Sequence, residues 1–182
     1  MCIVNVQGLK YAFIMDNPMA EYGINAAVQH NRLYAQATTN LQRDEVKDYW
    51  RTQLDDLGAK YAKNQTFRTF LYDVNILTGR MNAEKGMLFT EMGFRFSHAQ
   101  KSFSVYLKNR WCHGLIPAPP FCPIDSTVLN LLGRPWNNHP WTQMTEEEYR
   151  SVAKEILKRA GLAGLTAAQW ELVLFTRSFV EE

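Results

Sequence analysis

The chain has 182 residues, 46% of them hydrophobic, which is enough to bury the core of one domain without disulfides. Twenty basic and 18 acidic side chains leave a net charge of +2, which argues against a chain-wide attraction to nucleic acid or membranes. The three cysteines include no CxxC pair, which argues against a disulfide framework and against a compact zinc or iron–sulfur site. We therefore predict a single domain over residues 1–182 in the reducing cytoplasm, with no metal and no cofactor.

The first residues, MCIVNVQGLKYAFIMDN, lack the basic start and the uninterrupted apolar stretch of a signal peptide. No run approaches the roughly 20 apolar residues that span a bilayer. We expect a soluble monomer with no membrane partner.

Apolar residues recur three and four positions apart along most of the chain, with few β-branched alternations. This periodicity predicts an all-α fold of about eight helices. In chain order, the predicted helices cover residues 19–37, 44–61, 67–77, 82–92, 98–111, 126–132, 145–160 and 166–179. The second helix carries an apolar stripe made of Val46, Trp50, Leu54 and Leu57.

Several residues mark the expected ends of these helices. Gly79 is placed to stop the third helix, and Asn82 is placed to cap the start of the fourth. Asp125 directly precedes an apolar run and takes the N-cap position of the sixth helix. Capping boxes, in which a threonine and a carboxylate or amide bond reciprocally, are predicted at Thr145 with Glu148 and at Thr166 with Gln169.

Three irregular segments separate the helices in the second half of the chain. Residues 93–97 form a short connection with a single glycine, which predicts a helix-hairpin-helix-like element. Residues 114–123 contain four prolines and cannot be helical, and residues 133–143 form a loop rich in Trp, Asn and His. Because loops carry a large share of functional residues, we expect the active-site segment within residues 82–136.

Two charged residues in this segment have a chemically suggestive placement. Lys101 lies in the first turn of one helix, and Asp125 opens the next helix 24 residues later. The positive end of a helix dipole favours the neutral, nucleophilic form of a lysine amine. An aspartate held as an anion at a helix N-terminus is suited to stabilise a positive charge or to activate a nucleophile.

The surrounding runs HAQKSFSVYLKNRW and PPFCPIDSTVLNLLG resemble the helix-hairpin-helix DNA glycosylases. In that family a hairpin leads into a helix whose first turn carries a lysine, and an aspartate that follows a proline caps the next helix. The resemblance implies that Lys101 attacks C1′ of the nucleotide and forms a Schiff base. It also implies that Asp125 stabilises the oxocarbenium-like transition state, with double-stranded DNA carrying a modified or damaged base as the partner.

The C-terminal run AAQWELVLF is similar to the last helix of the branches that remove 8-oxoguanine. There an amide residue reads the flipped base and a phenylalanine stacks on it. The resemblance places Glu171 as the base reader, Phe175 as the stacking residue and Val105 as the other wall of the pocket. An ionised glutamate only accepts hydrogen bonds, as from the amines and ring N–H groups of cytosine or guanine. Gln29, in the first helix, is a candidate for the wall opposite the last helix.

The hairpin sequence MGFRFSHAQ lacks the glycine-rich turn with which this family holds a phosphate, so Arg95 and His98 are candidates to replace it. Between residues 91 and 140 there are five basic and two acidic side chains, a local charge of +3. The predicted DNA-contacting residues are Arg95, His98, Lys108, Arg134 and Trp136.

Each candidate residue also has an ordinary structural interpretation. Lys101 fits a solvated surface lysine, Asp125 a simple helix cap, and Phe175 a core residue. A metal site built from Cys112, His113, Cys122 and His139 is disfavoured, because their spacing pre-positions no two ligands.

The sequence therefore predicts a DNA glycosylase, with or without AP lyase activity, acting in repair or in antiviral defence. Its substrate is either oxidised guanine or another modified base, such as a hypermodified phage cytosine. If Lys101 is not the nucleophile, Asp125 activates water in a monofunctional reaction. The alternatives are a non-enzymatic helical nucleic-acid-binding or phage-defence protein and a helical protein with a small-molecule pocket.

Overall fold

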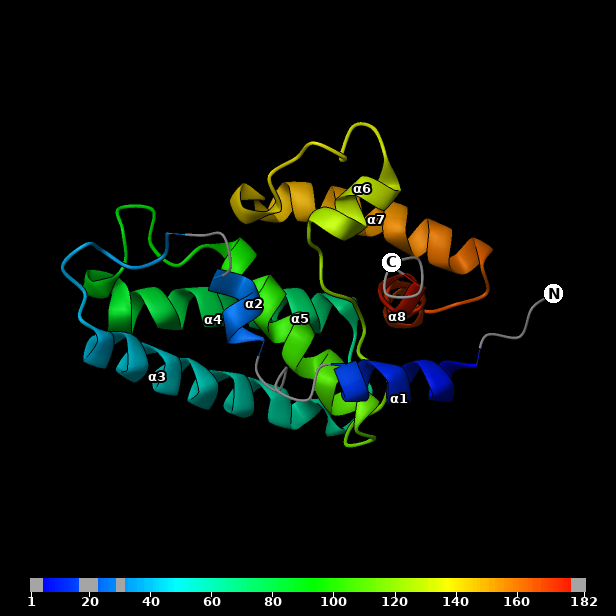
Figure 1. Cartoon of the computed structure of the whole chain (residues 1–182), viewed down its shortest axis with the longest axis horizontal. Helices are drawn as coiled ribbons and strands as arrows, with labels where there is room; N and C mark the ends of the chain where they lie inside the picture. Colours follow the sequence, from blue (N-terminus) through cyan, green and yellow to red (C-terminus); the bar gives the residue numbers. More distant parts are fainter. Residues whose placement is uncertain (1–4, 17–22, 29–31, 178–182) are drawn as a thin grey trace.

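A computed structural model of the chain describes residues 5–16, 23–28 and 32–177. Within these ranges the structure has eight α-helices and no named strand, which confirms the predicted all-α fold (Figure 1). The helices are α1 (Val6–Asp16), α2 (Ile24–Val28), α3 (Asn40–Gly58), α4 (Phe67–Lys85), α5 (Phe96–Cys112), α6 (Ser126–Leu132), α7 (Glu146–Leu162) and α8 (Ala167–Arg177). Short 3₁₀ turns are η1 (Ala59–Ala62), η2 (Gly86–Leu88) and η3 (Trp141–Gln143). None of the described helices is long and apolar enough to cross a bilayer.

Helix α5 is the centre of the packing. It contacts α1, α2, α3 and α4, while α7 packs on α8 and α8 packs on α1 (Figure 1). Fourteen of its 17 residues are buried, so it is covered on nearly all sides. Its buried polar groups therefore need partners inside the protein, as in the 3.1 Å hydrogen bond from the Trp50 indole to the Ser102 hydroxyl.

The apolar stripe predicted on the second helix is confirmed, because all four of its members are buried. The Trp50 ring meets Phe94 edge to face, with 4.6 Å between ring centroids. Phe70 of α4 stacks on Phe103 of α5 at 5.8 Å. These pairs connect α3 to the segment before α5, and α4 to α5, within one continuous apolar core.

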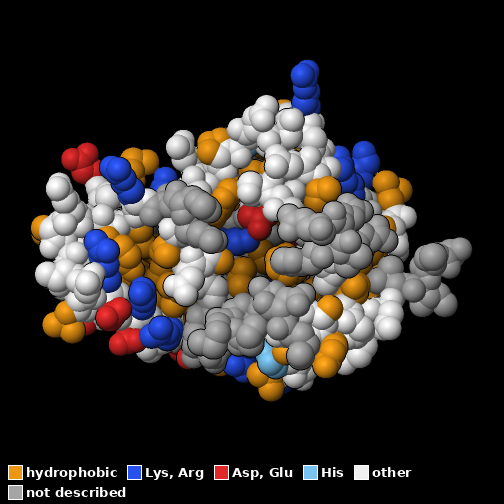
Figure 2. Space-filling view, viewed as in Figure 1, with side chains coloured by type: hydrophobic (Ala, Val, Ile, Leu, Met, Phe, Trp, Pro, Cys, Tyr) orange, Lys and Arg blue, Asp and Glu red, His pale blue; other side chains and the backbone are white. Residues whose placement is uncertain are grey.

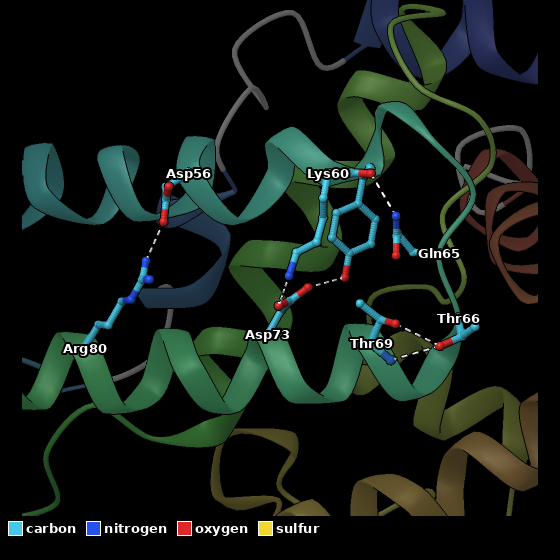
Figure 3. Close-up of polar contacts among 8 residues, drawn as sticks. Asp56, Lys60, Gln65, Thr66, Thr69, Asp73 and Arg80 are labelled. Carbon is cyan, nitrogen blue, oxygen red and sulfur yellow. Dashed lines mark hydrogen bonds and ion pairs between the residues drawn. The ribbon is translucent and has the colours of Figure 1, made fainter.

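Polar groups also connect α4 to α3 and to the turn η1 that follows it (Figure 3). The carboxylate of Asp73 is fully buried and accepts from the Lys60 ammonium and, over 2.7 Å, from the Tyr61 hydroxyl. Arg80, in the second half of α4, pairs with Asp56, two residues before the end of α3. Burial, followed by the hydrogen bond to Asp73, raises the pKa of Tyr61 well above its ordinary value. Tyr61 therefore remains a neutral hydrogen-bond donor.

Several predicted caps are confirmed. The Asp125 carboxylate accepts from the Val128 backbone N–H over 3.0 Å, and both threonine capping boxes form. These signals depend on residues within four positions of one another, so the local sequence was sufficient to locate them.

The predicted break between the third and fourth helices is wrong. Helix α4 runs through Gly79 to Lys85, and no helix covers residues 86–92 apart from the turn η2. The Asn82 side chain instead donates to the Phe94 carbonyl over 2.7 Å and accepts from the Phe94 N–H over 2.8 Å. Asn82 thus holds the connection to α5 rather than capping a helix. That connection spans residues 86–95 rather than 93–97, and the predicted helix-hairpin-helix-like element is not confirmed.

The N-terminal prediction is also corrected. Helix α1 was not predicted, and of the helix expected over residues 19–37 only α2 is present among the described residues. Residues 32–37 are not helical, because Leu33 and Ala35 form backbone hydrogen bonds with Thr90 and Leu88. Those long-range bonds replace the local bonds that a helix would make.

Candidate active site

Asp125 is brought to α5 by a side-chain clamp. The Gln100 amide donates to the Ile124 carbonyl over 2.9 Å, and its oxygen accepts from the Ile124 N–H over 3.4 Å. These bonds fix the end of the proline-rich segment against α5. Gln100 directly precedes Lys101, and Ile124 directly precedes Asp125. Sequence reasoning missed Gln100, whose only signal was a polar residue next to Lys101.

Lys101 and Asp125 form an ion pair, with 2.6 Å between Nζ and Oδ2. The two side chains are only 10% and 25% exposed. The other carboxylate oxygen accepts the Val128 N–H and so caps α6. Asp125 therefore has two roles, as the helix cap and as the partner of Lys101.

The surroundings of Asp125 favour its anion. Burial by itself would raise the pKa of this carboxyl. The charge and hydrogen bond of Lys101, the Val128 N–H and the charge of Lys108 act in the opposite direction, and together they hold the pKa below its ordinary value. A carboxylate that stays ionised is able to stabilise positive charge on a neighbouring group.

A second ion pair lies two helical turns along the same helix. Lys108 donates from Nζ to Oε1 of Glu171 over 2.9 Å, and its Nζ lies 2.8 Å from Oε2. The ammonium also lies 4.0 Å from the ring centroid of Phe175 and 4.6 Å from that of Phe13. Cations are attracted to aromatic faces, so these two rings help to enclose the charge.

The two pairs line one pocket that opens to solvent, and its empty space of about 450 Å³ includes part of that solvent. Among the described residues, those that line it are Phe13, Ala26, Lys101, Val105, Lys108, Pro123, Asp125, Glu171 and Phe175. Figure 2 shows acidic and basic groups side by side near the centre of the face that it draws, with hydrophobic side chains around them. Predominantly apolar walls with a few convergent polar groups are typical of ligand sites.

The pocket unites residues that are far apart in the sequence. The two predicted catalytic residues and three predicted base contacts, Val105, Glu171 and Phe175, all contribute to its lining. Gln29 lies outside the described residues, but Ala26 of the neighbouring α2 reaches the pocket. Phe13 was not anticipated, because α1 was not predicted from the sequence.

Two of the predicted DNA contacts are placed differently by the structure. Lys108 is only 4% exposed and faces the pocket, so it is not a surface residue that could meet a phosphate. His98 is fully buried, and its Nδ1 accepts from the Arg95 backbone N–H over 3.0 Å. Burial, followed by the charge of Arg95, lowers the pKa of His98 to about 3. His98 is therefore a neutral residue that supports the start of α5.

The remaining predicted contacts are more accessible. Arg95 is partly exposed, and Arg134 is exposed. Trp136 is partly buried against the core, and its ring centroid lies 6.1 Å from the ring centroid of His139. The structure places these side chains on or near the surface and leaves their role in binding DNA a prediction.

The chain matches no protein-family model, and no curated protein or solved structure matches it. The resemblance to helix-hairpin-helix glycosylases therefore stays a prediction that depends on the short motifs given above. Within the described residues, no group of three or more His, Cys, Asp or Glu side chains is placed to hold a metal ion.

Proposed function

We propose that this chain is a DNA glycosylase that takes a damaged or modified base into the pocket between α5 and α8. One observation carries the proposal: the Lys101 ammonium lies 2.6 Å from Asp125 on the wall of a pocket that Glu171 and Phe175 also line. Ionisable groups that converge in a cleft are frequent at catalytic sites. The pair unites a candidate nucleophile with an anion suited to stabilise positive charge.

The chemistry assigned to Lys101 is an attack on the sugar. Its Nζ forms a bond to C1′ while the bond from C1′ to the base breaks, and the electron pair of that bond leaves with the base. An ammonium has no free electron pair, so Lys101 first gives one of its three protons to Asp125, which passes that proton to the departing base. The resulting amine attacks and becomes a secondary ammonium with two protons. Asp125 stabilises the positive charge that develops on the sugar. The bond from C1′ to the ring oxygen of the sugar then breaks, one proton moves from the secondary ammonium to that oxygen, and a protonated Schiff base remains between Nζ and C1′.

The pocket walls suit a base taken out of the DNA stack. Flipping costs unstacking and unpairing energy, which contacts in the pocket must offset. Phe175 and Phe13 offer aromatic surface, and Val105 and Pro123 add aliphatic surface. Arg95 and Arg134 are the accessible charges proposed to contact phosphates, and their contribution would weaken with added salt.

Borohydride trapping on abasic-site DNA tests the proposed nucleophile. The wild-type protein should give a covalent adduct, and Lys101→Gln should give none because the amine is absent. Lys154→Gln is the matched control, since Lys154 is an exposed lysine on α7. An adduct that survives Lys101→Gln and is lost in another lysine variant would contradict the assignment.

Base release is measured in parallel on duplexes that contain oxidised guanine or a modified cytosine. Base release without an adduct would retain the glycosylase and replace the lysine mechanism by attack of water that Asp125 activates. DNA binding with neither an adduct nor base release would overturn the proposal and support a non-enzymatic nucleic-acid-binding protein.

A further inference from the structure

A tryptophan from the loop after α6 faces the proposed nucleophile. The Lys101 ammonium lies over the Trp141 ring, with 6.0 Å between Nζ and the ring centroid. Trp141 begins the turn η3, which contacts α5. It is not among the described residues that line the pocket, and the bond cleavage proposed above does not use it.

Hydrogen bonds to α5 and within the turn set the position of this ring. Ser97 and Lys101 lie four positions apart on α5, so both face the same side of that helix. The hydroxyl of Ser97, a fully buried residue, donates to the Thr142 carbonyl over 2.6 Å. The backbone N–H of Met144 donates to the Trp141 carbonyl over 3.2 Å, and Met144 is itself buried. These contacts hold the turn beside Lys101.

The face of an indole ring attracts positive charge. The attraction acts within about 6 Å of the ring centroid, and it is stronger for tryptophan than for phenylalanine. Lys101 is positively charged at two stages of the proposed reaction. It begins as the ammonium paired with Asp125, and it later forms the protonated Schiff base, in which Nζ keeps one proton. The Trp141 ring is therefore placed to stabilise positive charge on Nζ in addition to Asp125.

We propose that Trp141 is a positioning residue for Lys101 that prolongs the lifetime of the protonated Schiff base, an inference that rests on the proposed glycosylase function. Hydrolysis ends the Schiff base. The oxygen of a water molecule becomes the aldehyde oxygen on C1′, the bond from C1′ to Nζ breaks, and both water protons go to Nζ, which leaves as an ammonium. As the water attacks, positive charge moves from Nζ toward the incoming oxygen. The attraction to the ring weakens at that point, so the ring slows hydrolysis.

The lifetime of the Schiff base measures this effect. The adduct is formed on labelled abasic-site DNA, excess unlabelled abasic-site DNA is added, and borohydride added at intervals traps the Schiff base that remains. We expect a lifetime about 2- to 5-fold shorter in Trp141→Leu than in the wild type, the factor that a cation–π contact supplies where solvent has access. Trp141→Phe should give an intermediate value. Trp170→Leu changes another partly buried tryptophan, and this control should keep the wild-type lifetime.

Fluorinated tryptophan separates charge stabilisation from a structural role, and it applies even if Trp141→Leu folds poorly. 5-Fluorotryptophan keeps the shape of the ring but withdraws electron density from its face, which weakens the attraction to a cation. Incorporated at all five tryptophans, it should shorten the lifetime in the wild type and leave it unchanged in Trp141→Phe. A shorter lifetime in Trp141→Leu that fluorination does not reproduce would overturn the inference. A loss confined to DNA affinity would also overturn it and would make Trp141 a DNA contact.

The same measurements distinguish failure of this inference from failure of the proposed function. An adduct with equal lifetimes in the wild type and in Trp141→Leu would overturn the inference alone. Base release without an adduct would overturn the inference together with the lysine mechanism. The absence of both an adduct and base release would overturn the proposed function and this inference with it.

Discussion

Two lysine–aspartate pairs in this protein have similar local geometry but different surroundings. At η1 and α4, Lys60 pairs with Asp73, and at α5 and α6, Lys101 pairs with Asp125. Asp73 is fully buried, and both of its oxygens are occupied, since Tyr61 donates to the one that Lys60 does not take. Asp125 is partly exposed on the wall of a pocket.

The exposure of the two lysines follows the opposite order. The Lys60 side chain is 42% exposed and reaches the pair from the surface, whereas the Lys101 side chain is only 10% exposed. Because Lys101 and Asp125 line the pocket, a ligand that enters it would meet both groups. Asp73 is fully buried, and both of its oxygens already accept from protein donors. Opposite charges at hydrogen-bond distance do not by themselves identify a site, and access to a cavity is what separates the two pairs.

The largest expected effect is on the rate of base release. Asp125→Asn keeps an oxygen that can cap α6 but removes the negative charge, so release should fall by about 10²- to 10⁴-fold. Asp73→Asn, the matched change in the other pair, should leave the rate per folded molecule within about twofold. Single-turnover kinetics on the same duplex measure both. Equal losses in the two variants would contradict the distinction between the pairs.

For the free energy of unfolding, we expect the change at Asp73 to cost more than the change at Asp125. Asp73→Ala leaves the buried Tyr61 hydroxyl without its acceptor, and should lower the free energy of unfolding by about 1 to 3 kcal/mol. Asp125→Ala removes a helix cap, which should cost about 1 kcal/mol, and leaves the Lys101 ammonium on the wall of a pocket through which water can reach it. Urea unfolding measures both values. A larger loss at Asp125 would make that residue chiefly a structural one.

The smallest expected effect is on the pH dependence of stability. Because the folded protein holds the pKa of Asp125 below its ordinary value of 3.8, its anion stabilises the fold at and above neutral pH. That contribution should be constant at pH values well above 3.8 and should decline as pH falls through the lower, folded-state pKa. The difference between wild-type and Asp125→Asn unfolding free energies, measured from pH 7 down to pH 3, isolates it. A difference that grows on acidification would contradict the lowered pKa.

The sequence predicted best those features that short-range chemistry controls. The caps at Asp125, Thr145 and Thr166 each involve a side chain and a backbone group within one helical turn, and all three form. The helix break predicted at Gly79 and Asn82 is wrong, because a long-range contact controls this part of the chain. The Asn82 side chain bonds to the backbone of Phe94, twelve positions away, as well as to the Thr78 carbonyl, and local propensity contains no information on the contact with Phe94.

In the candidate site, too, the sequence was sufficient for some residues and insufficient for those whose place depends on long-range packing. Motif order was enough to select Lys101, Asp125 and Glu171, which the structure brings to one pocket. The sequence did not reveal that α5 is buried on nearly all sides, so Lys108 was assigned to a DNA-facing surface. A lysine seven positions after Lys101 lies on the same helix face, and that spacing was the available signal for its place in the pocket.

The most direct test of the central claim is to map the adduct. The wild-type protein is trapped with borohydride on abasic-site DNA, digested, and sequenced by mass spectrometry to find the modified lysine. We expect modification at Lys101 alone, with the adduct retained in Lys60→Gln and lost in Lys101→Gln. Modification at Lys60 or at another amine, or no adduct from a protein that releases a base, would contradict the assignment of Lys101 as the nucleophile.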